Sequence, residues 1–192
     1  MVYTKHGPRN NLWKVLVVCA AVVLDCTLLC ARDFQDASAI TKSRVRSTDA
    51  GILELFREGR ERSATLNELV SAIEQSAGIV YVEFGYCAFG HLNGCLLPFI
   101  TRVEGERYLR IVVSPDKHQR THDQLLALIA HELQHAREVI DHEEVVDTPT
   151  MEKMFRKIGA PVNHGYETPA AQATGDKVLA ELMNEARRVA RH

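Results

Sequence analysis

The sequence predicts an α+β fold in which a small sheet packs on one long helix and on a C-terminal helix. Two short runs rich in β-branched and aromatic residues, Ile79–Phe84 and Tyr108–Val113, are typical of strands. Apolar residues recur at helical spacing from Leu125 to Ile140, after this β-rich part of the chain. A second long helical pattern covers Ala170–Arg191.

The length of 192 residues fits one domain together with a removable segment, because domains mostly span about 100 to 200 residues. With 46% hydrophobic and 25% charged residues, the composition is that of a globular protein that can bury a core. The formal net charge of -2 provides no basic field of the kind that binds phosphate backbones. Nucleic acid is therefore not expected as a partner.

Residues 1–31 have the anatomy of a secretory signal peptide. Three basic residues precede the apolar run Val15–Leu24, and the segment ends on a small residue, Ala31. A transmembrane helix needs about 20 consecutive apolar residues, and Asp25 interrupts this segment. We therefore expect export to the periplasm or the cell exterior, with cleavage near Ala31 and membrane contact only through this signal. An uncleaved anchor would leave the domain in the same compartment.

Two of the five cysteines, Cys87 and Cys95, lie outside the signal segment. Gly90 and Gly94 give the segment between them turn flexibility. Because disulfides persist in exported proteins, we expect Cys87 and Cys95 to form one. Two buried free thiols are the alternative, and they become the favoured one if the chain is not exported.

Residues 32–50 are polar and aperiodic, which predicts a linker or a loosely attached arm, so the folded domain is expected to span residues 51–192. The first half of this domain is predicted to begin with helices and to continue with strands. In order, we expect a short helix around Ile52–Phe56, a helix over Ser63–Ser76, and strands over Ile79–Phe84, Leu96–Val103 and Tyr108–Val113.

The second half of the domain is predicted to be helical. A capping-box pattern that begins at Thr121 starts one long helix over residues 122–140. Thr148, Pro149 and Gly159 are expected to bound a short helix as its N-cap, its first residue and its terminating glycine.

The long helix carries the sequence His131-Glu132-Leu133-Gln134-His135. Two imidazoles four residues apart lie on one helix face, close enough to bind one Zn²⁺, while Glu132 projects beside the metal. A carboxylate there can take a proton from a zinc-activated water and deliver it to a leaving amine. Chance placement would give only about 0.03 such motifs in a chain of this composition. The pattern predicts a zinc hydrolase; two solvated histidines on a helix face are the alternative.

This motif resembles the active-site helix of the zincin metallopeptidases, which lies behind a small sheet. The segments VYVEFGYCAFGHLNGCLLPFI, AHELQHAREV and YETPAA are also similar to a group of uncharacterised exported bacterial proteins. The resemblance to zincins implies a zincin-like fold in which His131 and His135 bind zinc and Glu132 is the general base. The motif does not give the third ligand.

Four residues are candidates for the third ligand. In a continuing helix Asp141 lies about 80° away from the histidine face, and His142 is expected to be solvated near the helix end. Glu138 lies on the histidine face, but its short reach favours other roles over binding the metal: it either orients an imidazole by hydrogen bonding or pairs on the helix face with Arg137 or another neighbour. Glu167 resembles the glutamate that one zincin group, the gluzincins, supplies from a second helix. We expect Glu167 to be the ligand, with Glu138 as the alternative.

One feature departs from the gluzincin pattern. Thr168 and Pro169 look like a helix N-cap and first residue, which places Glu167 just before the last helix rather than inside it. A carboxylate at a helix entry can still reach a metal. Tyr166 and His164 are candidates for stabilising an oxyanion, or else are turn residues without such a role.

The sequence therefore predicts an exported, single-domain zinc peptidase that hydrolyses peptide bonds in peptide or protein substrates. A non-catalytic zinc-binding or partner-binding domain that retains the same helix is the alternative. A metal-free interaction module is a third possibility, which metal analysis would distinguish.

Overall fold

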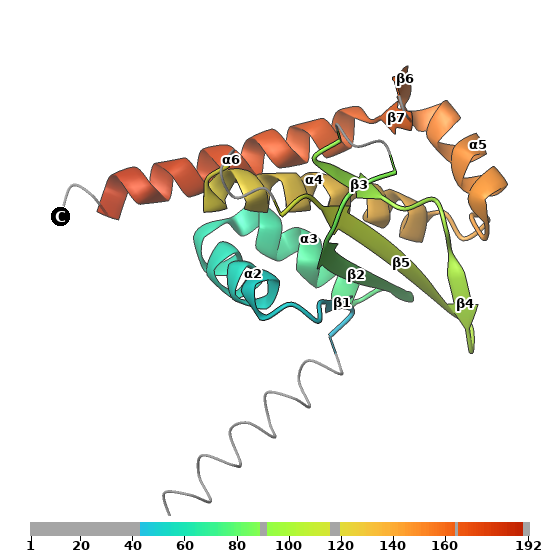
Figure 1. Ribbon diagram of the computed structural model, residues 1–192, viewed down its shortest axis with the longest axis horizontal. Helices are drawn as coiled ribbons and strands as arrows, with labels where there is room; N and C mark the ends of the chain where they lie inside the picture. Colours follow the sequence, from blue (N-terminus) through green and yellow to red (C-terminus); the bar gives the residue numbers. More distant parts are fainter. Residues whose placement is uncertain (1–42, 89–91, 116–119, 164, 190–192) are drawn as a thin grey trace, which may run out of the picture. The chain divides into compact units, whose positions relative to one another are not determined.

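The computed structural model of the protein describes residues 43–88, 92–115, 120–163 and 165–189 (Figure 1). The predicted signal peptide and residues 32–42 of the predicted arm lie outside these ranges. Within them the chain forms five helices and seven strands, so the α+β class is confirmed. The elements are β1 (Val45–Arg46), α2 (Ala50–Arg62), α3 (Ala64–Glu74), β2 (Gly78–Phe84), β3 (Gly94–Leu96), β4 (Thr101–Val103), β5 (Glu106–Val113), α4 (His122–Asp141), α5 (Thr148–Ile158), β6 (Ala160–Val162), β7 (Gly165–Glu167) and α6 (Pro169–Val189).

Five of the strands form one small mixed sheet in the order β1-β2-β5-β3, and β4 also pairs with β5. β1, β2 and β5 run parallel to one another, whereas β3 and β4 are antiparallel to β5. β3 pairs with the C-terminal end of β5, and β4 pairs with its N-terminal end. The inward side chains of β2 and β5 join one core with all five helices. These inward residues are Val80, Val82, Leu109, Ile111 and Val113.

The predicted arm over residues 32–50 extends too far, because its last residues belong to the fold. β1 pairs in parallel with β2, and Val45 is buried. The Glu74 carboxylate of α3 accepts hydrogen bonds from the Ser43 hydroxyl at 2.5 Å and from the Arg44 backbone N–H at 2.8 Å. A two-residue strand with one apolar side chain has no periodicity that the sequence could reveal, so only tertiary contacts define it.

The predicted strand over Leu96–Val103 is two strands, β3 and β4. Pro98 has no backbone N–H to donate to a ladder, so the pairing with β5 breaks there. The Pro98 carbonyl instead accepts a hydrogen bond of 2.6 Å from the Thr148 hydroxyl. The break leaves β3 as a three-residue strand that contacts α4.

The predicted disulfide between Cys87 and Cys95 is present, with their Cα atoms 6.2 Å apart. It joins the segment after β2 to the middle residue of β3. Cys95 also lies opposite Val112 in β5. The short strand β3 is therefore held both by backbone pairing and by a covalent bond.

The long helix α4 lies between the sheet and α6 (Figure 1). It covers the predicted residues 122–140 and one more, and the capping box at Thr121 is formed in both directions. At the other end the buried Arg107 guanidinium binds backbone carbonyls of the last helical turn and of the residues that follow it. Its four acceptors are the backbone oxygens of Val139, Ile140, His142 and Val145. Because α4 is fixed at both ends, its side chains project in defined directions.

The short helix α5 is capped by the Asp147 side chain, so Thr148 is its first residue and not its N-cap. After Gly159 the chain forms the β6–β7 hairpin, which the sequence did not predict because each strand has only three residues and no alternation. α6 then begins at Pro169, as predicted from the Thr168-Pro169 pattern. No helix in the described part of the chain is long and apolar enough to cross a membrane.

Candidate metal centre

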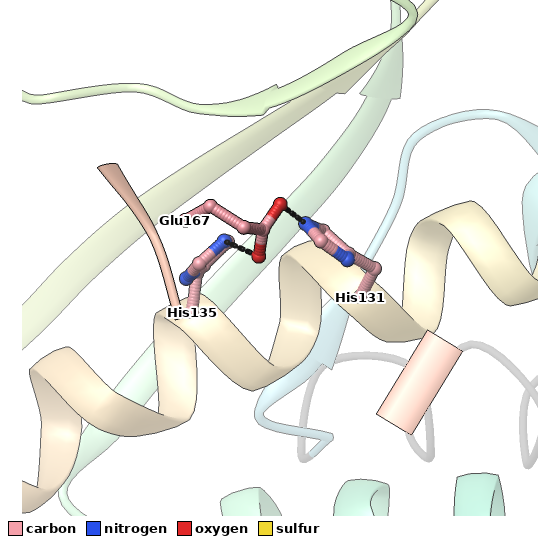
Figure 2. A group of neighbouring side chains, drawn as sticks. All are labelled: His131, His135 and Glu167. Carbon is pink, nitrogen blue, oxygen red and sulfur yellow. Dashed lines mark ion pairs between the residues drawn. The ribbon is translucent and has the colours of Figure 1, made fainter. Parts of the chain in front are cut away.

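Three side chains from two parts of the chain converge beside α4, as Figure 2 shows. His131 and His135 lie one turn apart on the same face of the helix, with their rings edge to face. Glu167 reaches them from the end of β7. Its Oε2 lies 3.4 Å from His131 Nε2, and its Oε1 lies 3.8 Å from His135 Nε2. The structure thus brings together the two histidines and the carboxylate that the sequence predicted.

The β6–β7 hairpin carries Glu167 to this position. Ala160 of β6 pairs with Glu167 of β7, directly after α5 ends. Gly159 permits the approach, because a Cβ there would stand 2.8 Å from the Glu167 carbonyl oxygen. Glu167 therefore comes from a strand end at the entry to α6, whereas the gluzincin resemblance implied a residue inside a second helix. Pro169 begins the helix two residues too late to include it.

α6 packs closely on α4 next to His131. A Cβ on Gly175 of α6 would stand 3.3 Å from His131 Cβ and 3.3 Å from the Ala127 carbonyl oxygen, so the missing side chain allows the close approach. Nδ1 of His131 lies on the side of α6, 3.7 Å from the position that a Cβ on Gly175 would take. Nε2 is the nitrogen directed at Glu167.

Glu138 contacts the second histidine, His135, through the ring nitrogen that does not face Glu167. Its Oε2 accepts a hydrogen bond of 3.1 Å from His135 Nδ1, and its Oε1 accepts one of 2.7 Å from the Thr168 hydroxyl. When Nδ1 carries the proton, the lone pair of His135 Nε2 faces Glu167. This is the geometry that an orienting role for Glu138 requires.

The donor set could hold a metal ion, around which the three side chains would have to draw closer together. Zinc binds imidazole nitrogen and carboxylate oxygen at about 2.0 to 2.2 Å, so its ligand atoms stand about 3.3 to 3.6 Å apart. The donor atoms of His131, His135 and Glu167 all lie within 4.8 Å of one another. Within the described ranges, this is the one group of three or more His, Cys, Asp or Glu side chains that lie close enough together to hold a metal ion. Two nitrogens and one carboxylate oxygen suit zinc, among other transition metals.

Glu132, the residue after the first histidine, turns toward β3 and is only 6% exposed. A Cβ on Gly94 of β3 would stand 3.0 Å from Glu132 Oε1. Burial raises the pKa of Glu132 to about 7, although the charge of His135 and the backbone of Leu96 act against the shift. A carboxyl group with a pKa near neutrality can both accept and return a proton, as a general base must.

The two histidines differ in their tendency to carry charge. Burial lowers the pKa of His131, and the neighbouring His135 lowers it further. Burial also lowers the pKa of His135, but the hydrogen bond to Glu138 and the nearby carboxylates outweigh it, so this pKa is raised. Because an imidazole binds metal through an unprotonated ring nitrogen, metal binding at His135 competes with protonation of the ring.

Two rejected candidates for the third ligand lie away from the group. Asp141 forms an ion pair with Arg137 at 2.7 Å on the helix surface. His142 Nδ1 lies 2.8 Å from the Glu138 carbonyl oxygen at the end of α4. Neither side chain joins the converging donors.

The two oxyanion candidates receive no support from the contacts described. The Tyr166 hydroxyl accepts a hydrogen bond of 3.4 Å from Arg156. Because side chains alternate along a strand, Tyr166 lies on the face of β7 opposite to Glu167. His164 lies outside the described residues.

Sequence reasoning missed three residues that shape the site. Gly94 and Gly175 permit close backbone approaches, and Thr168 hydrogen-bonds Glu138. The capping pattern had placed Thr168 at a helix start, but nothing local indicated what its hydroxyl would contact. The available signal was the position of each glycine: a glycine inside a strand or a helix can mark a place where another part of the chain approaches the backbone closely.

Comparison with known proteins gives no match: no protein-family model, no curated protein and no solved structure is similar enough to the chain. The side chains of the site are therefore what indicates a function.

Proposed function

We propose that the protein is an exported zinc-dependent peptidase of the zincin type that hydrolyses peptide bonds in peptides or proteins. The observation that carries the proposal is the convergence of His131 Nε2, His135 Nε2 and the Glu167 carboxylate, with the buried carboxyl group of Glu132 on the adjacent residue. Three protein ligands leave a position for water or substrate, which distinguishes catalytic zinc sites from structural ones.

The side chains have separable roles in this proposal. Bound zinc would supply an acidified water as nucleophile near neutral pH and would polarise the carbonyl under attack. Glu132 takes the proton from the attacking water, and its pKa of about 7 allows it to return that proton to the departing amine. Glu138 keeps the His135 ring oriented. β3 covers the Glu132 carboxyl group and limits its contact with bulk water.

The Cys87–Cys95 disulfide supports the proposed export, because disulfides persist outside the reducing cytosol. The signal-like pattern of residues 1–31 would provide the route.

A zinc-binding module without turnover is the alternative function. A structural zinc site needs a fourth protein ligand, and Glu138, which contacts His135, is the candidate that the sequence offered for one. Both of its oxygens are engaged, one by His135 and the other by Thr168. This use of Glu138 favours the catalytic interpretation.

Turnover of a mixed peptide library by the purified protein tests the proposal. Cleavage products should form with zinc-loaded protein, disappear when a chelator removes the metal, and return when zinc is added back. Folded, zinc-loaded protein that cleaves no peptide of the library would favour the non-catalytic module.

A further inference from the structure

Thr168 contacts both halves of the proposed metal site. Its hydroxyl donates a hydrogen bond of 2.7 Å to Glu138 Oε1 and accepts one of 3.1 Å from the Ala171 backbone N–H. Its own backbone N–H donates to Glu167 Oε1 at 3.0 Å. One residue is thus bound to the proposed ligand Glu167 and to the carboxylate that holds His135.

The surroundings of Thr168 make these bonds hard to replace. Thr168 is 1% exposed and Glu138 is 8% exposed, so solvent has little access to restore a lost partner. A hydroxyl group has one proton, and donating it to Glu138 leaves a lone pair for the Ala171 N–H. Both contacts therefore fix the same rotamer of Thr168.

We propose that Thr168 is a positioning residue that couples the Glu167 ligand to the His135 ligand, so that the end of β7 and the middle of α4 bind zinc as one unit. The inference rests on the proposed zinc site. Thr168 itself is not one of the proposed metal ligands. It fixes the Glu138 carboxylate, which fixes the ring of His135, and its backbone restrains Glu167.

Removing the hydroxyl breaks this arrangement at a defined point. Without it, Glu138 Oε1 is left buried without its donor, and the carboxylate can rotate away from His135 Nδ1. The ring of His135 then loses the partner that directs Nε2 toward the metal. The measurable consequence is weaker zinc binding.

Ser63 offers a matched control at the other end of α6. It is the buried N-cap of α3, where its hydroxyl accepts the Leu66 backbone N–H at 3.1 Å and donates to Glu181 at 2.6 Å. These contacts repeat those of Thr168: one bond caps a helix and the other reaches a carboxylate on a different helix. From Glu167 to Glu181 the chain rises about 20 Å along α6, so Ser63 is remote from the metal site.

The experiment measures the zinc affinity of the full chain by competition with a chromophoric chelator. Thr168→Val should weaken zinc binding about 10- to 100-fold, the range typical for partners of metal-bound histidines. Thr168→Ser, which keeps the hydroxyl, should restore the affinity to within about threefold of wild type. Ser63→Ala should lower the melting temperature but leave the zinc affinity unchanged.

A double-variant comparison tests the route through Glu138. Glu138→Ala should weaken zinc binding by itself, and adding Thr168→Val should cause little further loss, because the contact is already gone. Fully additive losses would overturn this route. If Thr168→Val does not fold, Thr168→Gly removes the same hydroxyl at a capping position where glycine costs little.

The outcomes separate this inference from the proposed function. Wild-type affinity in the folded Thr168→Val variant, or an equal loss in Ser63→Ala, would overturn the coupling role while leaving the zinc site intact. Absence of zinc binding in the wild type would instead overturn the proposed function, on which the inference depends.

Discussion

Gly94 of β3 lies directly against the carboxylate of Glu132 in α4. A Cβ at Gly94 would stand 3.0 Å from Glu132 Oε1 and 3.2 Å from Glu132 Cγ, closer than side chains normally approach. The absence of a side chain therefore sets how near β3 can come to the proposed general base. The disulfide on the next residue, Cys95, holds the strand in that place.

Gly94→Ala should lower the turnover number about tenfold and leave the zinc content unchanged, because small displacements of a catalytic group are costly. Steady-state kinetics on a library-derived peptide, combined with metal analysis, would measure both. Gly85→Ala is the matched control, since a Cβ there would meet Val112 Cγ1 at the same distance, 3.0 Å, instead of Glu132. Equal losses in both variants would mean that strain in the sheet, and not the Glu132 contact, is responsible.

Glu132→Gln should keep zinc and fold but lose turnover by about 10² or more, because the amide cannot accept the proton of the attacking water. Glu68→Gln, at an exposed position of α3, should behave like wild type. Substantial turnover by zinc-loaded Glu132→Gln protein would contradict the role of Glu132 as base.

The metal-free protein should become less stable as the pH rises from about 4.5 to about 7. Burial raises the pKa of Glu132 from 4.5 to about 7, so in this window the folded chain holds a proton that the unfolded chain releases. The stabilisation that protonated Glu132 gives the folded chain is fully present below pH 4.5, and it is lost as the pH rises through about 7. For a shift of this size the loss is about 3 kcal/mol.

Denaturant unfolding of chelator-treated wild type and Glu132→Gln across this pH range would measure the effect. The variant lacks the titrating group, so the difference between the two free energies of unfolding should change steadily with pH. A constant difference would show that Glu132 titrates normally in the folded chain.

The local sequence was sufficient to predict α4 and the motif that it carries. Its capping box and apolar spacing are both short-range patterns, and a helix places His131 and His135 on one face by geometry alone. The resemblance to gluzincins predicted Glu167 as the third ligand. It did not predict that a hairpin, β6–β7, brings Glu167 to the histidines. The two strands of that hairpin are too short to produce a pattern of their own.

Contacts between distant residues were the part that the sequence could not predict. β1 is defined by its pairing with β2 and by the bonds of Glu74, not by its own composition. The hydrogen bond from Thr168 to Glu138 likewise exists only because α6 packs on α4. Such contacts depend on the register of packed elements, which no local pattern encodes.

Reduction of the Cys87–Cys95 disulfide should lower the free energy of unfolding by at most about 2 to 3 kcal/mol, because a short closed loop restricts the unfolded chain only modestly. Denaturant unfolding with and without reductant would measure the change, and the Cys87→Ser/Cys95→Ser double variant should match the reduced protein. Intact-mass analysis provides the chemical check. Two free thiols in protein produced in an oxidising compartment would contradict the assignment.

Zinc content of the purified protein and three variants tests the central claim most directly. If His131, His135 and Glu167 bind the metal, the wild type should carry close to one zinc per chain, and His135→Ala and Glu167→Ala should lose most of it. Glu132→Gln should retain it, because Glu132 is proposed as base and not as ligand. Zinc content in His135→Ala and Glu167→Ala equal to that of the wild type, or none in the wild type itself, would contradict the metal site.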